Sequence, residues 1–342
     1  MEHKSPDMST GQRLLILTSS STGNNVFCTP AIHFIRKNFP EAVIDVVALS
    51  SLSAEVFAGN RDINRIHIIK SARAFDKLAK DYSQVICLNS NALKKLGNIQ
   101  TRMQAAGSLV QDVHHAEQLL QFVASIFGRE VSDADRSYVI DSSQGKADAL
   151  LSKHDVAPDA LLINIHLGCG TTLLHGWKFF YNKRSDDKKL WPIEQYVLLG
   201  NALVNALPGV RIVITGTRNE SFLAKSFTRQ VPGTINLVGK TSVPDLRQLM
   251  DRASLFIAHD CGVFHIAAAS EVPIVGLFGP TNHILTGPYP QRPQHTVIKK
   301  ESMAEISVEE VVGAALKQIE YSRKIHRTDG TVSFVSASSA IQ

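Results

Sequence analysis

Residues 254–290 constrain the fold more than any other part of the chain. They contain two apolar runs, 255–258 and 274–278, separated by turn residues and an alanine-rich helical segment, 266–270. Continuous apolar runs bounded by turn residues indicate strands buried on both faces, as in a parallel sheet covered by helices. Two strands joined by a helix form a βαβ unit, and the ligand crevice of such a sheet lies at the carboxyl ends of its strands.

Polar residues follow both predicted strands. Asp260, Gly262 and His265 follow the first strand, and a Gly-Pro-Thr sequence at 279–281 follows the second. Gly262 lets the backbone approach a ligand, and the amides that open the next helix can hold an anion such as a phosphate. His265 can donate a hydrogen bond to the same anion. The alternative is that Asp260 caps the helix and that His265 is a satisfied core histidine.

The residue order of this stretch resembles the signature of glycosyltransferase family 9, the bacterial heptosyltransferases. The family pattern reads Asp, Ser or Thr, Gly, two residues and His, and it ends in Phe-Gly-Pro-Thr. Here it is Asp260, Cys261, Gly262 and His265, with residues 278–281 at the end. The resemblance implies an α/β fold of the GT-B type, with two Rossmann-like parallel-sheet domains facing a central cleft. Cys261 stands where the family has a hydroxyl that bonds the donor phosphates.

Length and composition favour a two-domain protein of the cytosol. The chain has 342 residues, of which 44% are hydrophobic and 20% charged, values typical of soluble globular domains. No apolar run approaches the roughly 20 residues that span a bilayer. Residues 1–11 lack a signal-peptide core, and the four scattered cysteines fit reduced thiols. We therefore expect a cytoplasmic protein.

The net charge of +5 is mild for this length. It suits anionic substrates or a peripheral association with the anionic inner face of the cytoplasmic membrane. Solvated surface charge is the plainer interpretation for most of the basic residues. Because no long basic run and no nucleic-acid motif is present, we expect no nucleic-acid partner.

Strands alternate with helices along the first half of the chain, as in a Rossmann-type sheet, although the Gly-x-Gly-x-x-Gly fingerprint is absent. We expect strands at residues 14–17, 43–48, 65–69 and 85–88, a loop at 18–25, and helices at 30–38 and 113–127. A change of composition near residue 155 predicts a domain boundary. The predicted division is a disordered 1–11, an acceptor domain 12–155, a nucleotide-sugar domain 156–325 and a disordered tail 326–342.

The loop after the first strand resembles the acceptor loop of the family, Ser-Ser-x-Gly-Asp followed by Thr-Pro-Ala. Ser21, Gly23 and Asn25 belong to this loop, and Asn24 stands at the position of the aspartate that is taken as the family's general base. An amide cannot accept a proton at neutral pH. Thr18 likewise replaces a basic residue that the family often has.

Three interpretations of Asn24 remain open. Another group could serve as the base, with Asp112, His114 and His115 the nearest candidates in sequence order. Alternatively, Asn24 only orients the acceptor, and a slower reaction is driven by positioning and phosphate stabilisation. In the third interpretation, the chain binds a nucleotide sugar without turning it over.

The second half repeats the alternation of strands and helices. We expect strands at residues 161–165 and 211–215, and helices at 193–207, 242–253 and 307–325. By resemblance to GT-B enzymes, the last helix is expected to return to the first domain.

Loops of this second half supply further donor-binding candidates. Thr171 and Thr172 lie in a loop with glycines that suits a diphosphate, and the plain alternative is a flexible turn. Lys189 precedes a Trp-Pro pair as in the family, and its ammonium group would offset the charge of a leaving nucleoside diphosphate. Glu220 follows a strand end and could accept from ribose hydroxyls, or it could be an acid in the first turn of a helix, favourable to the helix dipole.

Together these features predict an inverting, metal-independent glycosyltransferase without a cofactor. The family resemblance implies transfer of a heptose from ADP-heptose to a lipopolysaccharide core acceptor, either lipid-linked or a free saccharide. A catalytically impaired nucleotide-sugar-binding protein of the same fold is the alternative, and an unrelated Rossmann-type nucleotide enzyme is a third.

Overall fold

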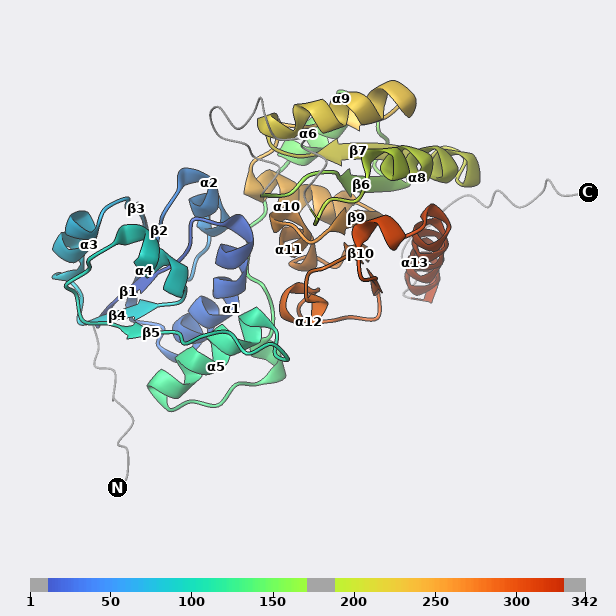
Figure 1. Cartoon of the computed structure of the whole chain (residues 1–342). Coiled ribbons are helices and arrows are strands. Elements are labelled where there is room, and N and C mark those ends of the chain that lie inside the picture. Colours follow the sequence, from blue (N-terminus) through green and yellow to red (C-terminus); the bar gives the residue numbers. More distant parts are fainter. Residues whose placement is uncertain (1–11, 171–187, 329–342) are drawn as a thin grey trace, which may run out of the picture.

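Two parallel β-sheets organise the chain, one in each half of the sequence (Figure 1). The computed structural model describes residues 12–170 and 188–328. Within them the strands pair only in parallel, which confirms the predicted pair of Rossmann-like α/β domains. The termini 1–11 and 329–342, together with 171–187, lie outside the described residues.

The N-terminal sheet has the strand order β3-β2-β1-β4-β5. Its strands are β1 (Arg13–Leu17), β2 (Val43–Ala48), β3 (Arg65–Ile68), β4 (Gln84–Cys87) and β5 (Gln104–Ala105). Helices α3 (Ala72–Ala79) and α4 (Ser90–Leu96) bury side chains against one face. The other face is covered by α1 (Thr22–Asn38), α2 (Ser51–Ala54) and α5 (His115–Phe127). The four strands predicted from apolar runs are confirmed to within one residue at each end. Strands β1, β2 and β4 are mostly buried, whereas the edge strand β3 is largely exposed.

The C-terminal sheet has the strand order β11-β10-β9-β6-β7-β8. Its strands are β6 (Leu162–His166), β7 (Arg211–Thr215), β8 (Ile235–Asn236), β9 (Leu255–His259), β10 (Ile274–Phe278) and β11 (His295–Lys299). Its longer helices are α8 (Ile193–Ala206), α9 (Ser221–Gln230), α10 (Val243–Arg252) and α13 (Val308–Thr328). The shorter ones are α6 (Lys146–Ser152), α11 (Gly262–Ala268) and α12 (His283–Thr286). The βαβ unit predicted from residues 254–290 is therefore β9, α11 and β10.

Helix α1 begins earlier than its sequence indicates. Residues 18–25 are predicted as a loop, but the helix starts at Thr22 and runs through Pro30 to Asn38. Pro30 has no N–H to bond the carbonyl of Val26, and the Thr29 hydroxyl donates to that carbonyl instead, at 2.8 Å. The same hydroxyl accepts from the amide of Val139 at 3.1 Å, in the segment that connects the two domains. These bonds let the helix continue through a residue that usually starts or ends one.

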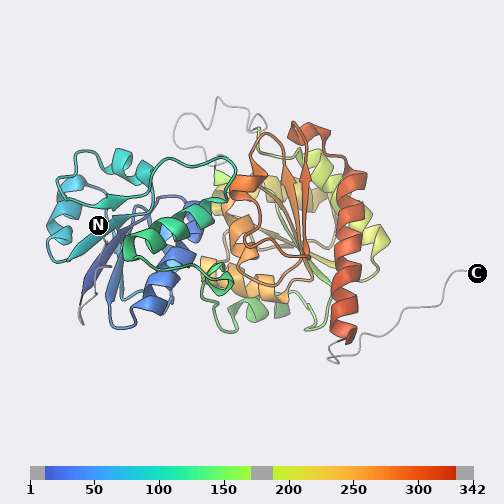
Figure 2. The ribbon, with the colours of Figure 1, turned by 90° about the horizontal axis from the view of Figure 1, so that it is seen from below.

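The last helix and the chain before residue 155 both pack on the C-terminal sheet. Helix α13 buries Val311, Ala315 and Ile319 against this sheet, and Figure 2 shows it on the side away from the N-terminal domain. The expected return of the terminal helix to the first domain is therefore wrong, because its apolar stripe is already covered by α8 and the sheet. Helix α6 buries Ala147 and Leu151 in a cluster with the C-terminal strands.

The domains meet along α1 and α11, which pack against each other. One continuous apolar core runs across this contact, from Ile16 and Phe27 on the N-terminal side to Phe256 and Phe264 on the other. The view in Figure 2 places α1 and α5 on the side of the first domain that faces α10 and α11. We call the contact between the two helices and the loops that precede them the domain junction.

A second set of contacts ties the loop after β10 to the start of α5. The Tyr289 hydroxyl donates to the Glu117 carboxylate at 2.7 Å, and Arg136 donates to the same carboxylate from Nε at 3.0 Å. His114 bonds the Gly287 carbonyl through Nε2 at 3.2 Å, and its ring stacks on Tyr289 with the centroids 4.8 Å apart. The two domains are therefore joined by polar bonds as well as by an apolar core.

Candidate active site

The turn between β9 and α11 brings three of the predicted donor-binding residues together. Lys189 donates from Nζ to a carboxylate oxygen of Asp260 at 3.0 Å, and the other oxygen lies 3.8 Å from His265 Nε2. Asp260 is 7% exposed and His265 is 3% exposed, whereas the Lys189 side chain is 41% exposed and opens this group to solvent. A distance of 3.8 Å is too long for a hydrogen bond. Asp260 therefore pairs with Lys189 rather than capping α11.

His265 is buried but not satisfied. Its ring packs against Phe27 of the other domain, with the centroids 4.5 Å apart. Burial lowers the pKa of His265 to about 3, so the imidazole is neutral at physiological pH. Within the described residues its Nδ1 has no hydrogen-bond partner. Buried polar groups are normally paired, so within the described residues His265 is not a fully satisfied core histidine.

Two glycines allow the acceptor loop to touch the turn between β9 and α11, which we call the donor turn. A Cβ on Gly23 would lie 2.9 Å from Cδ2 of His265, and a Cβ on Gly262 would lie 3.2 Å from Cβ of Thr22. Real Cβ atoms do not come as close as the first of these distances without a shift of their neighbours. Residues that the sequence assigns to opposite substrates are therefore in direct contact across the domain junction.

The acceptor loop is held by its own hydrogen bonds. The Asn25 side chain is fully buried, accepts from Ser19 N at 2.8 Å and donates to the Ser53 carbonyl at 2.9 Å. Ser21 is exposed, and its amide donates to the Ser19 hydroxyl at 3.1 Å. Asn24 is half-buried and donates weakly to that hydroxyl, at 3.4 Å. Asn25 thus shapes the loop, whereas Ser21 and Asn24 remain partly open to a substrate.

The three candidates for an alternative base differ in their exposure and in their hydrogen bonds. Asp112 is exposed on a loop. The His114 ring uses both nitrogens, because Nδ1 accepts from Ala116 N at 3.1 Å and Nε2 bonds Gly287 O. The His115 ring lies 5.0 Å from the Phe27 ring, and burial lowers its pKa to about 4. The two histidines thus lie beside the same phenylalanine as His265.

Glu220 is buried between the loops that follow β6 and β7. One oxygen accepts from Thr217 N at 2.6 Å and from its hydroxyl at 3.0 Å, which caps the short helix Arg218–Glu220. The other oxygen lies 3.8 Å from His166 Nε2, and a Cβ on Gly168 would come within 2.0 Å of it. The interpretation of Glu220 as an acid in the first turn of a helix is thus correct for one oxygen. The other one faces the carboxyl ends of two neighbouring strands.

Cys261 is buried at the start of α11, and burial raises its pKa, so that the thiol stays protonated. Thr171 and Thr172 lie outside the described residues. Among residues 12–170 and 188–328, no cluster of three or more His, Cys, Asp and Glu side chains is arranged to hold a metal ion.

The sequence analysis misses a layer of buried polar groups in the C-terminal sheet. Thr215 donates to the Asn164 side chain at 3.1 Å, and Tyr196 OH bonds His259 Nδ1 at 2.9 Å. Burial lowers the pKa of His259 to about 3, and within the described part of the chain its Nε2 has no hydrogen-bond partner. Both β6 and β9 end in a histidine, and this repetition at adjacent strand ends is a signal that could have revealed the layer.

Comparisons with known proteins agree with this architecture. Residues 176–315 match glycosyltransferase family 9 (heptosyltransferase). Lipopolysaccharide heptosyltransferase 3 of Escherichia coli is 25% identical over 295 residues, which cover 78% of this chain and 83% of the relative. The chain is thus similar to this family over residues 176–315 and to a heptosyltransferase over most of its length. The signature Asp260, Cys261, Gly262 and His265 falls inside the residues that match the family.

Solved structures of the same family share its fold. A family 9 glycosyl transferase from Veillonella parvula aligns with a TM-score of 0.77 at 18% identity, covering 93% of this chain and 100% of that one. E. coli heptosyltransferase WaaC with ADP aligns with a TM-score of 0.65 at 18% identity, covering 90% and 100%. These alignments confirm the GT-B architecture of this chain.

Proposed function

We propose that the protein is an inverting glycosyltransferase that transfers a heptose from ADP-heptose to a saccharide of the lipopolysaccharide core. The relatives named for this reaction support the choice of substrates. The observation that carries the proposal is the contact at the domain junction, where Gly23 of the acceptor loop touches His265 of the donor turn. A reaction between two bound substrates needs their sites to adjoin, and proximity of this kind supplies much of the rate enhancement.

In this reaction the acceptor hydroxyl oxygen bonds the anomeric carbon as the bond from that carbon to the β-phosphate oxygen breaks. ADP leaves with the bonding electron pair, so negative charge grows on its phosphates. The Lys189 ammonium group and an N–H of His265 would stabilise this charge, and burial would strengthen the interaction made by His265. Binding of the diphosphate would also satisfy the buried nitrogen that has no partner within the described residues.

The hydroxyl proton needs an acceptor, and Asn24 cannot be one. His115 is the candidate that the geometry favours, because it lies at the domain junction beside Phe27 and its pKa of about 4 keeps it neutral. A base with so low a pKa is weak, and we therefore expect slow turnover. His115→Gln tests this role: the rate should fall while binding of ADP-heptose is unchanged.

The direct test is a transfer assay with ADP-heptose and a heptose-acceptor core oligosaccharide, in which ADP release and the mass of the product are followed together. Product heavier by one heptose, formed in step with ADP, is the expected result. The absence of any transfer with each core acceptor of successive length would reject the proposal. Binding is followed separately, because ADP-heptose at about a hundred times its Kd should stabilise the fold by about 2.7 kcal/mol.

The second candidate function is a nucleotide-sugar-binding protein that has lost its chemistry, and Asn24 is the observation that favours it. The two candidates differ in one result. A binding protein would be stabilised by ADP-heptose without releasing ADP, and Asn24→Asp would not change this.

We place the reaction at the cytoplasmic face of the inner membrane, where a lipid-linked core acceptor would be available. None of the helices among the described residues is long and apolar enough to cross a membrane. Association would then be peripheral and electrostatic, and it should be lost when the salt concentration is raised.

A further inference from the structure

Positive charge is concentrated in one segment of the N-terminal domain. Residues 65–102 contain eight lysines and arginines but only two aspartates, a formal charge of +6, whereas the whole chain carries +5. The remainder of the protein is thus close to neutral. All eight basic residues are exposed. Charge this unevenly distributed indicates a surface with an anionic partner.

These basic side chains are not neutralised by ion pairs. Among the residues that the structure describes, none of the eight takes part in an ion pair. The carboxylate of Asp76 is engaged by the amides of Gln100 and Thr101, at 3.1 and 2.9 Å. The acid at the centre of the patch thus bonds the amides of a loop and forms no ion pair with the neighbouring cations.

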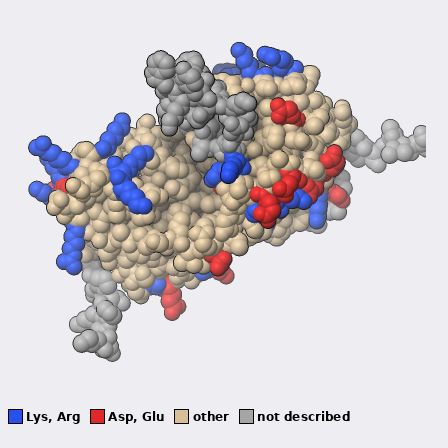
Figure 3. Space-filling view, in the orientation of Figure 1, with Lys and Arg blue, Asp and Glu red and all other residues tan. Residues whose placement is uncertain are grey.

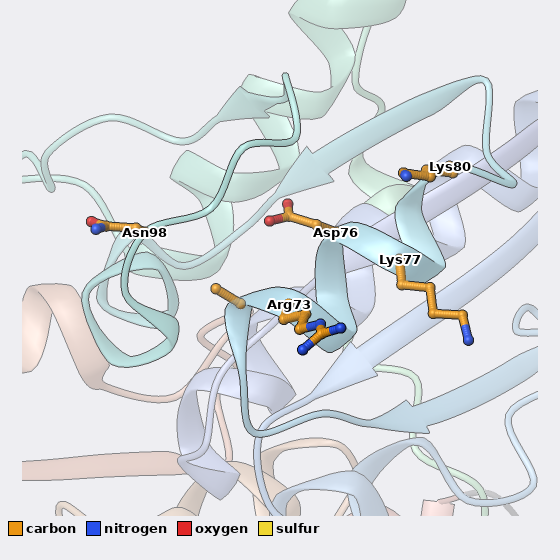
Figure 4. Close-up of a pocket in the computed structure, with 6 residues that line it drawn as sticks. Arg73, Asp76, Lys77, Lys80 and Asn98 are labelled. Carbon is orange, nitrogen blue, oxygen red and sulfur yellow. The ribbon is translucent and has the colours of Figure 1, made fainter.

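The centre of the surface is the outer side of α3. Arg73, Lys77 and Lys80 lie at helical spacing and line a shallow hollow together with Ala72, Asp76 and Asn98 (Figure 4). In Figure 3, blue side chains gather over the end of the N-terminal domain that lies away from the C-terminal domain, with little red among them. A hollow lined by three cations suits a phosphate group.

The charged surface reaches the acceptor loop. Helices α3 and α4 cover the same face of the sheet, with Phe75 and Leu96 in one core cluster. From α4, Lys95 donates through Nζ to the Ser20 hydroxyl at 2.7 Å, in the loop that leads to Asn24. A partner bound along α3 and α4 would therefore present its groups to the acceptor side of the junction.

The exposed apolar side chains of this edge of the sheet lie on the face opposite α3. Ile66 and Ile68 on the edge strand β3 are 37% and 49% exposed and pair with Val46 and Ala48, whose side chains face α1 and α2. The surface around α3 is therefore basic rather than amphipathic. A cluster of exposed cations suits the headgroup region of an anionic bilayer, and no nucleic-acid-binding motif accompanies it in the sequence.

We propose that the outer side of α3, with the basic residues of 65–102 around it, docks the protein on an anionic phospholipid membrane. Docking in this way places the acceptor loop toward the lipid surface. Its purpose rests on the proposed function, since a lipid-linked acceptor makes docking useful. Binding itself needs neither donor nor acceptor, and the two proposals can therefore fail separately.

The test is co-sedimentation of the full chain with vesicles of phosphatidylcholine alone or of phosphatidylcholine and phosphatidylglycerol in equal parts. The triple variant Arg73→Gln, Lys77→Gln, Lys80→Gln is compared with the matched control Lys225→Gln, Arg229→Gln, Lys317→Gln, which removes three exposed cations from the other domain. Each cation near an anionic surface contributes about fivefold in affinity, so the triple variant should bind about a hundredfold more weakly. The control should bind as the unmodified protein does.

Three outcomes would overturn the proposal: no binding to the anionic vesicles, equal binding to both kinds of vesicle, or equal losses in the triple variant and the control. A fourth would reassign the surface to the acceptor, namely binding of a soluble core oligosaccharide through the same three residues without vesicle binding. Thermal unfolding of each variant checks that the exposed substitutions leave the fold intact. Vesicle binding without any sugar transfer would retain this proposal and reject the proposed function.

Discussion

The donor turn and the acceptor loop meet at one junction but are built in different ways. The donor turn holds a paired lysine and carboxylate and a buried histidine with a nitrogen that has no partner among the described residues. The acceptor loop contains no charged residue between Thr18 and Asn25, and Asn25 uses its amide to hold the loop in shape. Under the proposed function, the donor turn would supply groups that bind phosphate, whereas the acceptor loop would mainly supply a fixed shape.

The largest effect is expected on the donor side, for His265→Ala. Loss of a buried donor that faces developing charge typically reduces kcat by about 100- to 1000-fold. Steady-state ADP release with saturating acceptor measures the change. His295→Ala is the matched control, since His295 is also buried in the C-terminal domain but lies on β11. Equal losses in both variants would mean that His265 only supports the fold.

Lys189→Ala should come next, with a rise in KM for the nucleotide sugar of about 10- to 100-fold. A hydrogen bond to a charged group contributes about 1.5–3 kcal/mol, and one tenfold step is about 1.4 kcal/mol. The neighbouring Lys188 is exposed, and Lys188→Ala serves as the control. If the two alanine variants bind ADP-heptose equally well, Lys189 acts only as the partner of Asp260.

On the acceptor side, Asn24→Asp should produce a gain. A carboxylate at this position can accept the hydroxyl proton, and we expect kcat to rise by about tenfold, less than a well-placed general base provides. The pH–rate profile should then follow the new carboxylate, and Asn24→Ser should show no gain. An unchanged rate in Asn24→Asp would place the proton acceptor elsewhere and make His115→Gln the decisive variant.

The smallest effect tests the contact itself. Gly23→Ala adds a Cβ at 2.9 Å from the His265 ring, so one of the two elements must shift. Overpacking of this kind costs about 1 kcal/mol or more, which corresponds to about fivefold in kcat/KM. Gly107→Ala is the control, because a Cβ there meets nothing within 4 Å. Wild-type kinetics for Gly23→Ala would show that the junction opens before the reaction.

Apolar runs were sufficient to predict the central strands, because strands buried on both faces are continuous apolar runs. They did not predict β5, β8 and β11, which are short or only partly buried. Helical periodicity failed at the start of α1, where Thr22, Gly23 and Asn24 are weak helix formers that tertiary contacts hold in a helix. The bond between Lys189 and Asp260 joins residues 71 positions apart, and no local pattern indicates which loops a fold brings together. The motif residues could thus be selected from the sequence, whereas their partners required the structure.

The hydroxyl of Thr29 links the proline turn of α1 to the segment between the domains. Because it binds the Val26 carbonyl and the Val139 amide at once, that amide should exchange with deuterium slowly even though it belongs to no helix or strand. One side chain thus links the segment between the domains to the helix whose first turn belongs to the acceptor loop. A movement of the domains relative to each other would therefore act on α1 within two turns of Asn24.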